Sequence, residues 1–150
     1  MVELAAGRYV AQFAVAVLAT ISFSVTFRVP LRHYLACGLT GAVGWLAYIL
    51  CTDCLALSAP VATLLAALPL TACARLFAIQ RKAPITLFLL CGIFPLVPGA
   101  GIYYTAYYFL RNDRAQFASR GVETLKIAVA LELGIALVCS IPLKRQKKQS

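Results

Sequence analysis

The sequence predicts an all-α integral membrane protein with five transmembrane helices, the fourth of them broken near the bilayer midplane. Hydrophobic residues make up 62% of the 150 residues and charged residues only 13%, a composition more apolar than that of soluble domains. The charges lie between long uncharged runs, and about 20 apolar residues are enough for a helix to cross a bilayer. The length favours a single domain, residues 1–150.

The first three apolar runs each predict one span. They are about Tyr9–Phe27, Tyr34–Leu50 and Leu55–Ala74. In the second run Gly38, Gly41 and Gly44 share one helical face. Small residues on one face allow a neighbouring helix to approach closely, so this face is predicted to be a packing face.

Polar residues mark the two links between these spans. His33, the single histidine, follows Arg28 and Arg32 after the first span and is expected at the membrane interface. After the second span, Asp53 is expected to cap the third helix, with Thr52 as the alternative cap.

The chain is organised around the uncharged run Pro84–Leu110, which is longer than a membrane-crossing helix needs to be. Pro95 and Pro98 lack an N–H and clash with the preceding helical turn. Gly99 and Gly101 tolerate backbone angles that other residues avoid. This span is therefore predicted to be broken in its middle. The two half-helices are expected at about Pro84–Phe94 and Gly101–Leu110.

A break at this depth predicts a substrate-binding site. Irregular backbone near the midplane is tolerated only where protein buries it or water reaches it, and discontinuous helices form substrate sites in many transporters. The predicted site consists of the prolines and glycines of the break together with Tyr103 and Thr105. Two alternatives stay open: a proline-kinked helix without a site, and an interfacial tyrosine belt that includes Tyr103 as well as Tyr107 and Tyr108.

The last part of the chain supplies two acidic candidates for coupling transport to an ion. Asp113 is a good N-cap for a helix that begins at Arg114. An amphipathic stretch then leads into the last apolar run, about Ile127–Leu143. Glu132 lies inside this run, where an acidic residue is costly and is a candidate for function. The alternative for Glu132 is a partner in an intramembrane pair or a residue that faces a wet cavity.

The formal charge of +9 is distributed as in a membrane protein. Basic residues lie at the ends of apolar runs, with a final cluster at Lys144, Arg145, Lys147 and Lys148. Such charges set topology and contact anionic lipid, and no nucleic-acid-binding motif is present. With the N-terminus outside, most basic links and the basic tail face the cytoplasm, so we expect a multi-pass protein with a cytoplasmic C-terminus.

The six cysteines lie in or at the edges of apolar runs, where free cysteine behaves as a small hydrophobic residue. Cys51 and Cys54 form a CxxC pair, but neither a second pair nor a nearby histidine accompanies them. No metal or other cofactor is therefore expected. A redox role of this pair stays open as the weaker alternative.

Three stretches resemble the threonine/serine exporter family, specifically its C-terminal-half domain. They are Phe27–Arg32 with Cys37–Trp45, then Phe94–Tyr103, and the small-residue-rich last helix after Gly121. The resemblance covers almost the whole chain, and its most specific part is the Pro-x-x-Pro-Gly-x-Gly-x-Tyr motif of the second stretch. Two features depart from the family pattern: the turn Arg111-Asn112-Asp113 stands where a Gly-Asp turn is expected, and an acid at Glu132 is not typical.

The resemblance implies a function and a partner. Full-length members consist of two five-helix halves, so a chain of this length corresponds to the second half of an inverted-repeat-type transporter. It implies a membrane subunit of equal or larger size that carries the first half. The implied function is a secondary exporter of threonine and serine in the cytoplasmic membrane, in which freed amides near Gly99 and Gly101 meet a substrate carboxylate.

Three other functions compete with this one. A dicarboxylate such as succinate is an alternative substrate that some two-subunit relatives suggest. A non-transporting scaffold or assembly subunit would use the break only for packing. An enzyme acting on lipid would need clustered carboxylates or histidines, whereas the five acidic residues and one histidine are scattered; the sequence therefore does not predict an enzyme.

Overall fold

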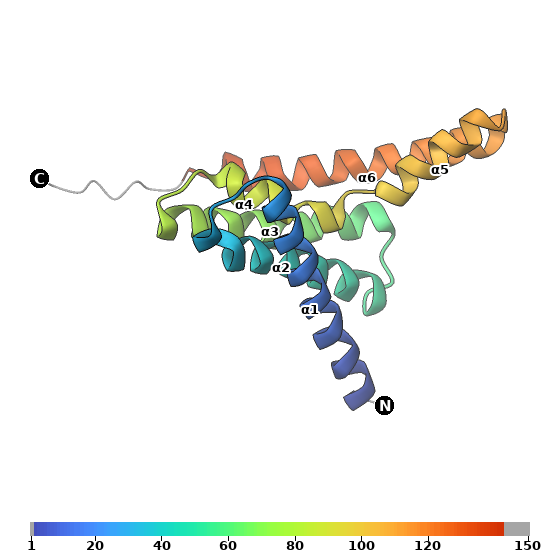
Figure 1. Cartoon of the computed structure of the whole chain (residues 1–150). Helices are drawn as coiled ribbons and strands as arrows, with labels where there is room; N and C mark the ends of the chain where they lie inside the picture. The colour runs from blue at the N-terminus through green and yellow to red at the C-terminus, as the bar shows by residue number, and fades with distance from the viewer. Residues whose placement is uncertain (1, 143–150) are drawn as a thin grey trace, which may run out of the picture.

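The computed structural model describes the backbone of residues 2–142 and the side chains of residues 7–142. Every regular element in this part of the chain is a helix (Figure 1). The α-helices are α1 (Val2–Thr26), α2 (Tyr34–Asp53), α3 (Ala59–Arg81), α4 (Ile85–Gly92), α5 (Gly99–Leu110) and α6 (Arg114–Ser140). Two short 3-10 helices, η1 (Leu31–His33) and η2 (Phe94–Leu96), precede α2 and α5. The basic cluster at Lys144–Lys148 lies outside the described residues.

Three to four segments are long and apolar enough to cross a membrane. Three are single segments, Gly7–Thr26, Leu31–Asp53 and Ala59–Arg81. The fourth is the pair Ile85–Leu96 and Gly99–Leu110, bent by 58°, if the pair counts as one span. Helix α6, which contains the fifth predicted span, is not among these candidates; Glu123, Lys126 and Glu132 interrupt its apolar stretch.

Helix α2 packs between α1 and α3 through its glycine face. A Cβ atom on Gly41 would collide with the Thr20 side chain of α1, and one on Gly44 would lie 2.5 Å from Leu70 Cδ1 of α3. Such distances leave no room for a methyl group without movement of a neighbour. The predicted packing face is thus confirmed, but it is shared by two neighbouring helices.

The C-terminal half of α6 packs along α3. A Cβ atom on Gly134 would lie 2.6 Å from Ala67 Cβ and 2.8 Å from the backbone carbonyl oxygen of Leu64. Near the end of α6, the Arg75 guanidinium of α3 donates hydrogen bonds to the carbonyl oxygens of Val138 and Ile141. The Val138 carbonyl also accepts from the N–H of Ile141, the C-cap residue of α6, so Arg75 anchors the end of α6 on α3.

Buried hydroxyl groups in these helices are satisfied locally. Thr20, Thr40 and Thr71 are fully buried. Each hydroxyl donates to the carbonyl oxygen four residues earlier in its own helix, over 2.7 to 2.8 Å. Because their polar groups need no partner on another helix, these threonines act as small residues that allow close helix packing.

Helix α5 and residues 114–124 of α6, which we call the arm, project beyond the other helices (Figure 1). None of the 12 residues of α5 is buried. Within the arm, a Cβ atom on Gly101 would collide with the Thr124 side chain, and the rings of Phe109 and Phe117 pack with centroids 5.5 Å apart. The arm is therefore held together mainly by contacts between its own two helices.

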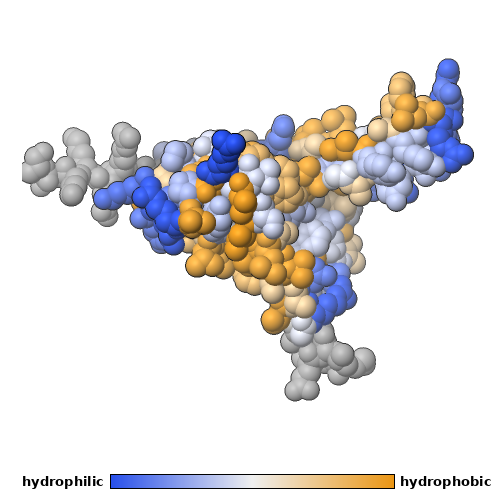
Figure 2. Space-filling view, viewed as in Figure 1, coloured by the Kyte–Doolittle hydropathy of each residue, from blue (hydrophilic) through white to orange (hydrophobic). Residues whose placement is uncertain are grey.

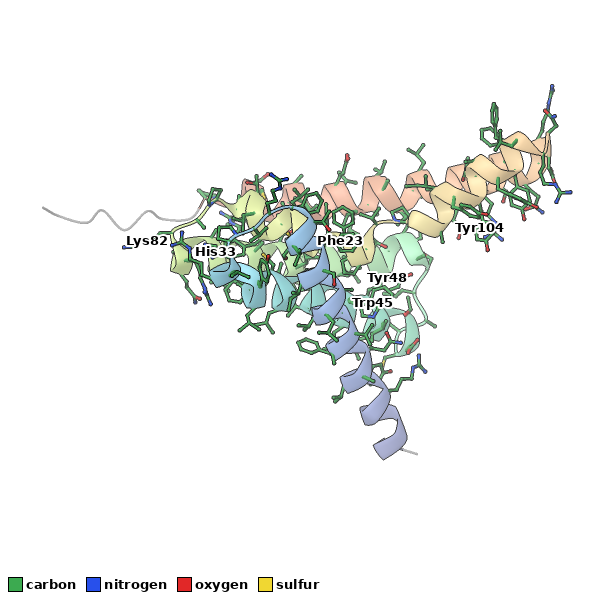
Figure 3. All side chains as sticks on the ribbon, in the orientation of Figure 1. Phe23, His33, Trp45, Tyr48, Lys82 and Tyr104 are labelled. Atoms are coloured by element: carbon green, nitrogen blue, oxygen red, sulfur yellow. The ribbon has the colours of Figure 1, made fainter. Side chains whose placement is uncertain are left out.

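The links after α1 and α3 meet at one end of the molecule, where Figure 3 shows His33 and Lys82. Arg81 donates a hydrogen bond to the carbonyl oxygen of Arg32 and so joins the two links. His33, expected at the membrane interface, lies at this end of the molecule and is only 2% exposed, because its ring packs edge-on against Phe88 with centroids 5.5 Å apart.

The link between α2 and α3 differs from the prediction for the N-cap of the third helix. Asp53 is the last residue of α2, and its carboxylate accepts a hydrogen bond of 2.7 Å from Arg8 of α1. The N-cap residue of α3 is Ser58, without a side-chain cap bond. The prediction that Asp53 or Thr52 caps the third helix is therefore wrong, because α2 extends through both residues and a separate loop precedes α3.

Candidate binding groove at the helix break

The break between α4 and α5 is formed by a short stretch of backbone with rearranged hydrogen bonds. Pro95 lacks the N–H group that would bond the Cys91 carbonyl oxygen in a continuous helix. The Gly99 N–H donates to the Val97 carbonyl oxygen over 2.7 Å. Helix α5 then begins, and its first-turn amides lack intrahelical partners as in any helix. The two halves meet at an angle of 58°.

The near side of the break is packed against α1, α2 and α3. Phe94 stacks on Phe23 of α1 with ring centroids 4.2 Å apart. Leu96 belongs to a buried cluster that includes Leu70 and Leu131. This packing fixes the position of the break, and Figure 3 shows Phe23 where α1 reaches it. The far side, toward α5, is open: a Cβ atom on Gly99 would meet no atom within 4 Å.

A groove of about 680 Å³ borders the break at Val97 and Pro98. Its walls come from the break, α5 and α6, and it is lined by Ile93, Val97, Pro98, Ile102, Thr105, Ala106, Phe109, Phe117, Gly121, Thr124, Leu125, Ala128, Leu131, Glu132 and Ile135. This volume is in the range of small-molecule sites, which are mostly apolar with a few polar groups that orient the ligand. Most of this lining is apolar, and the polar side chains within it are two threonines and one glutamate.

The two threonines lie in the arm end of the groove. Thr105 donates to the carbonyl oxygen of Gly101, and Thr124 donates to that of Arg120, each over 2.7 Å. With the proton committed to its own helix, each hydroxyl oxygen has only lone pairs left to offer. Toward a ligand, this end of the groove therefore presents hydrogen-bond acceptors in an apolar wall.

Glu132 of α6 also lines the groove, as do Val97 and Pro98 of the break. Within residues 7–142, ion pairs join Arg8 to Asp53 and Arg120 to Glu123, and none involves Glu132. Its carboxylate faces the same cavity as the broken backbone, so the acidic side chain that the sequence singled out and the break belong to one groove.

Only some of the predicted site residues line the groove. Pro98, Thr105 and Glu132 line the groove, whereas Pro95, Gly99, Gly101, Tyr103 and Asp113 are outside its lining. Pro95 lies within η2, and Gly101 contacts Thr124 where α5 and α6 meet. Asp113 accepts a hydrogen bond of 3.1 Å from the Gln116 N–H as the N-cap of α6, which confirms the predicted cap at the opposite end of the arm from the break.

The tyrosines of α5 form a row on the outer surface of the arm. Tyr103 is 63% exposed, and its ring packs against those of Tyr104 and Tyr107 with centroids 5.3 and 6.4 Å apart. Figure 3 shows Tyr104 on this outer surface. An exposed aromatic row fits the interfacial belt that the sequence offered as an alternative for Tyr103.

Most of the groove lining was not predicted from the sequence, including Phe117, Gly121 and Thr124. A signal for them exists. Gly101 and Thr105 on α5, and Gly121 and Thr124 on α6, are pairs of small residues about one helical turn apart. Such pairs mark close helix contacts in membranes, and a Cβ atom on Gly121 would lie 3.4 Å from Thr105 Cγ2.

The cysteines form no recognisable metal or disulfide site in the described part of the chain. No group of three or more histidine, cysteine or acidic residues that could hold a metal ion is found among the described residues. Cys51 and Cys54 are free thiols. Cys37 and Cys91 are buried in one cluster with Ala36 and Phe88, as expected for cysteine used as a small hydrophobic residue.

These features define a class of protein: a helical membrane protein whose broken helix borders a groove, as in many transporters. Residues 12–141 match the family described as Threonine/Serine exporter, ThrE. The chain therefore belongs to the threonine/serine exporter family, a family of amino-acid transporters rather than of enzymes. Among curated proteins and solved structures, no match to the chain is found.

Proposed function

We propose that this chain is one half of a secondary exporter of small polar metabolites, with threonine and serine as its substrates. A second five-span membrane subunit supplies the other half. The proposal is carried by the groove beside the helix break in a member of this family. Substrate sites of secondary transporters form where the broken helices of two related halves meet.

The packing of the break supports a site near the bilayer midplane. Leu96 shares a buried cluster with Leu70, and Leu70 lies midway along α3, which runs from Ala59 to Arg81. If α3 crosses the membrane, the break lies near the middle of the crossing. In this arrangement α4 and α5 together form the fourth span, and the apolar part of α6 forms the fifth.

The distribution of basic residues supports an orientation. Arg28, Arg32, Arg81 and Lys82 are exposed at the end of the molecule where the links after α1 and α3 meet, and hydrophilic residues gather at this end in Figure 2. Basic links face the cytoplasm in most inner-membrane proteins. We therefore place this end in the cytoplasm and the N-terminus outside, in the cytoplasmic membrane.

The exposed surface of the arm supports a partner subunit. Ile102, Tyr103 and Phe109 are 55%, 63% and 64% exposed, and the groove is open on one side. The open side is where the second half would close the groove around a substrate. The Gly99 amide is already bonded to Val97, so the first-turn amides of α5 that would meet a substrate carboxylate are those of Ala100 and Gly101, since helix N-termini favour anions.

The proposal is tested by efflux from cells loaded with labelled threonine, serine or succinate. The chain is expressed alone and together with the membrane protein that co-purifies with it. Efflux of threonine or serine only when both chains are present is the expected result.

Two other results would change the proposal. Efflux of succinate alone would keep the two-subunit architecture and replace the substrate. No efflux of any of the three compounds from a pair shown to assemble would favour the scaffold function.

A further inference from the structure

We infer that Glu132 binds the ammonium group of the exported substrate and so selects amino acids over dicarboxylates. This inference rests on the proposed function and assigns one residue of the same groove. It concerns charge recognition only, and it does not require Glu132 to carry the coupling ion.

The position of Glu132 is the first argument. Its side chain lines the groove together with Val97 and Pro98, the residues that immediately precede α5. Pro98 is the N-cap residue of α5, so a ligand in this groove can border both the start of α5 and Glu132. Glu132 therefore belongs to the groove that the break borders.

The charge of the groove is the second argument. Glu132 is the one ionisable side chain in the groove lining that the structure describes. Its neighbours in the lining include Ile93, Leu131 and Ile135, which offer no hydrogen bonds to a carboxylate. A charged group in apolar surroundings inside a membrane is costly unless a group of opposite charge pairs with it. In the described chain nothing supplies that positive charge, so the groove is suited to a ligand that brings one.

The chemistry of the two candidate substrates is the third argument. An ammonium group has three hydrogen-bond donors and a positive charge, which suits a carboxylate. A dicarboxylate has only acceptors and two negative charges, so Glu132 would repel it. Thr124 lies roughly two helical turns before Glu132, about 12 Å along the axis, so one small amino acid cannot contact both residues, and we assign the recognition to Glu132 alone.

Two other roles would place a carboxylate in the same groove. Glu132 could pair with a lysine or arginine of the second subunit, or it could carry a coupling proton. All three roles are sensitive to neutralising Glu132, but only ammonium recognition depends on which substrate is transported. A pair of substrates that differ only in the amino group therefore separates them.

The experiment measures counterflow in proteoliposomes that contain the chain and its co-purifying subunit. The substrates are labelled threonine and labelled 3-hydroxybutyrate, which is the threonine skeleton without the amino group. The variants are Glu132→Gln, which removes the charge and keeps the shape, and Glu132→Asp, which keeps the charge. Glu123→Gln is the matched control, because Glu123 lies on the same helix in an exposed pair with Arg120 at 3.8 Å and outside the groove lining.

The expected result is a loss that depends on the substrate. Glu132→Gln raises the KM for threonine about tenfold or more, the size expected for losing a charged hydrogen bond, and leaves 3-hydroxybutyrate counterflow unchanged or increased. Glu132→Asp retains part of the preference for threonine, and Glu123→Gln behaves as the unmodified chain.

Several results would overturn the inference without touching the proposed function. Equal losses for both substrates would indicate an ion pair with the partner subunit. Intact threonine counterflow with loss of efflux driven by a pH gradient would indicate proton coupling. Failure of Glu132→Gln to assemble, with assembly restored in Glu132→Asp, would indicate a structural charge. If the unmodified complex transports neither threonine nor serine, the proposed function is wrong, and the inference about Glu132 is then wrong as well.

Discussion

The packed pair α2–α3 and the arm differ in how much of their surface is buried by other parts of this chain. Both are apolar and both contain glycines, but α2 has buried residues from Ala36 to Ile49, whereas α5 has none among its 12 residues. The glycines of α2 contact two different neighbouring helices, while Gly101 in the arm contacts only the other arm helix. The pair has a buried face on each helix, whereas α5 of the arm has no buried residue.

Under the proposed function, this difference would explain the place of the candidate site. The break and Glu132 lie at the boundary between the packed helices and the arm, with one side of the break packed on Phe23 and Leu70 and the other side facing the groove. A rigid boundary next to an open surface can hold one wall of a binding site in place while a partner supplies the other wall. Substitutions on the two sides should therefore have different consequences.

The largest expected effect is in the packed region. Gly134→Ala places a methyl group 2.8 Å from the Leu64 carbonyl oxygen, which is backbone and cannot easily move. We expect a loss of about 1–3 kcal/mol in the free energy of unfolding, as for other overpacked sites. Gly99→Ala, whose methyl group would meet no atom within 4 Å, should stay within about 0.5 kcal/mol of the unmodified chain. Unfolding of both variants in detergent checks this, and equal losses would contradict the contrast between packed and open positions.

A smaller effect is expected in the arm. The methyl group of Gly101→Ala would collide with the Thr124 side chain. A second substitution can shorten this side chain, whereas the Leu64 carbonyl next to Gly134 is backbone and cannot be removed. We expect a loss of about 1 kcal/mol that is partly recovered when Gly101→Ala is combined with Thr124→Ala. A double-mutant cycle on unfolding in detergent measures this coupling. Additive losses would mean that the two residues do not meet in solution.

The smallest effects are expected at the two ion pairs. The Arg8–Asp53 pair joins α1 to the end of α2 at 2.7 Å, and the Arg120–Glu123 pair lies on the arm at 3.8 Å, with both of its side chains more than half exposed. Arg8→Ala should cost about 0.2–1 kcal/mol, and Arg120→Ala less than about 0.5 kcal/mol. Unfolding at low and high salt checks both values; an Arg120→Ala loss larger than that of Arg8→Ala would mean that the arm is more tightly held than its exposure indicates.

Local sequence signals predicted much of this fold. The glycine face of α2, the N-cap at Asp113 and the start of α6 at Arg114 depend on residues close together in the chain, and the structure agrees with each. Helix ends near the break were less accurate, since α4 ends at Gly92 and α5 begins at Gly99. Proline and glycine indicate that a helix stops, but neighbouring helices decide where.

The features that sequence reasoning missed depend on contacts between distant parts of the chain. The burial of His33 requires Phe88, and the pairing of Asp53 requires Arg8. The composition of the groove likewise depends on how α6 lies against α5, which brought Phe117 and Thr124 into the lining and left Tyr103 outside it. Spacing along one helix shows which residues share a face, but it does not show what that face contacts.

The continuity of α6 has a mechanical consequence. Helix α6 runs unbroken for 27 residues, about 40 Å at 1.5 Å per residue, from the arm past Glu132 to the anchor at Arg75. The parallel route through α5 and α4 is interrupted at residues 93–98, where Phe94 and Leu96 are held by packing. Since α6 is the one unbroken helix that joins the arm to the packed helices in the described chain, a force on the arm would pass to them mainly along α6, which forms a wall of the groove.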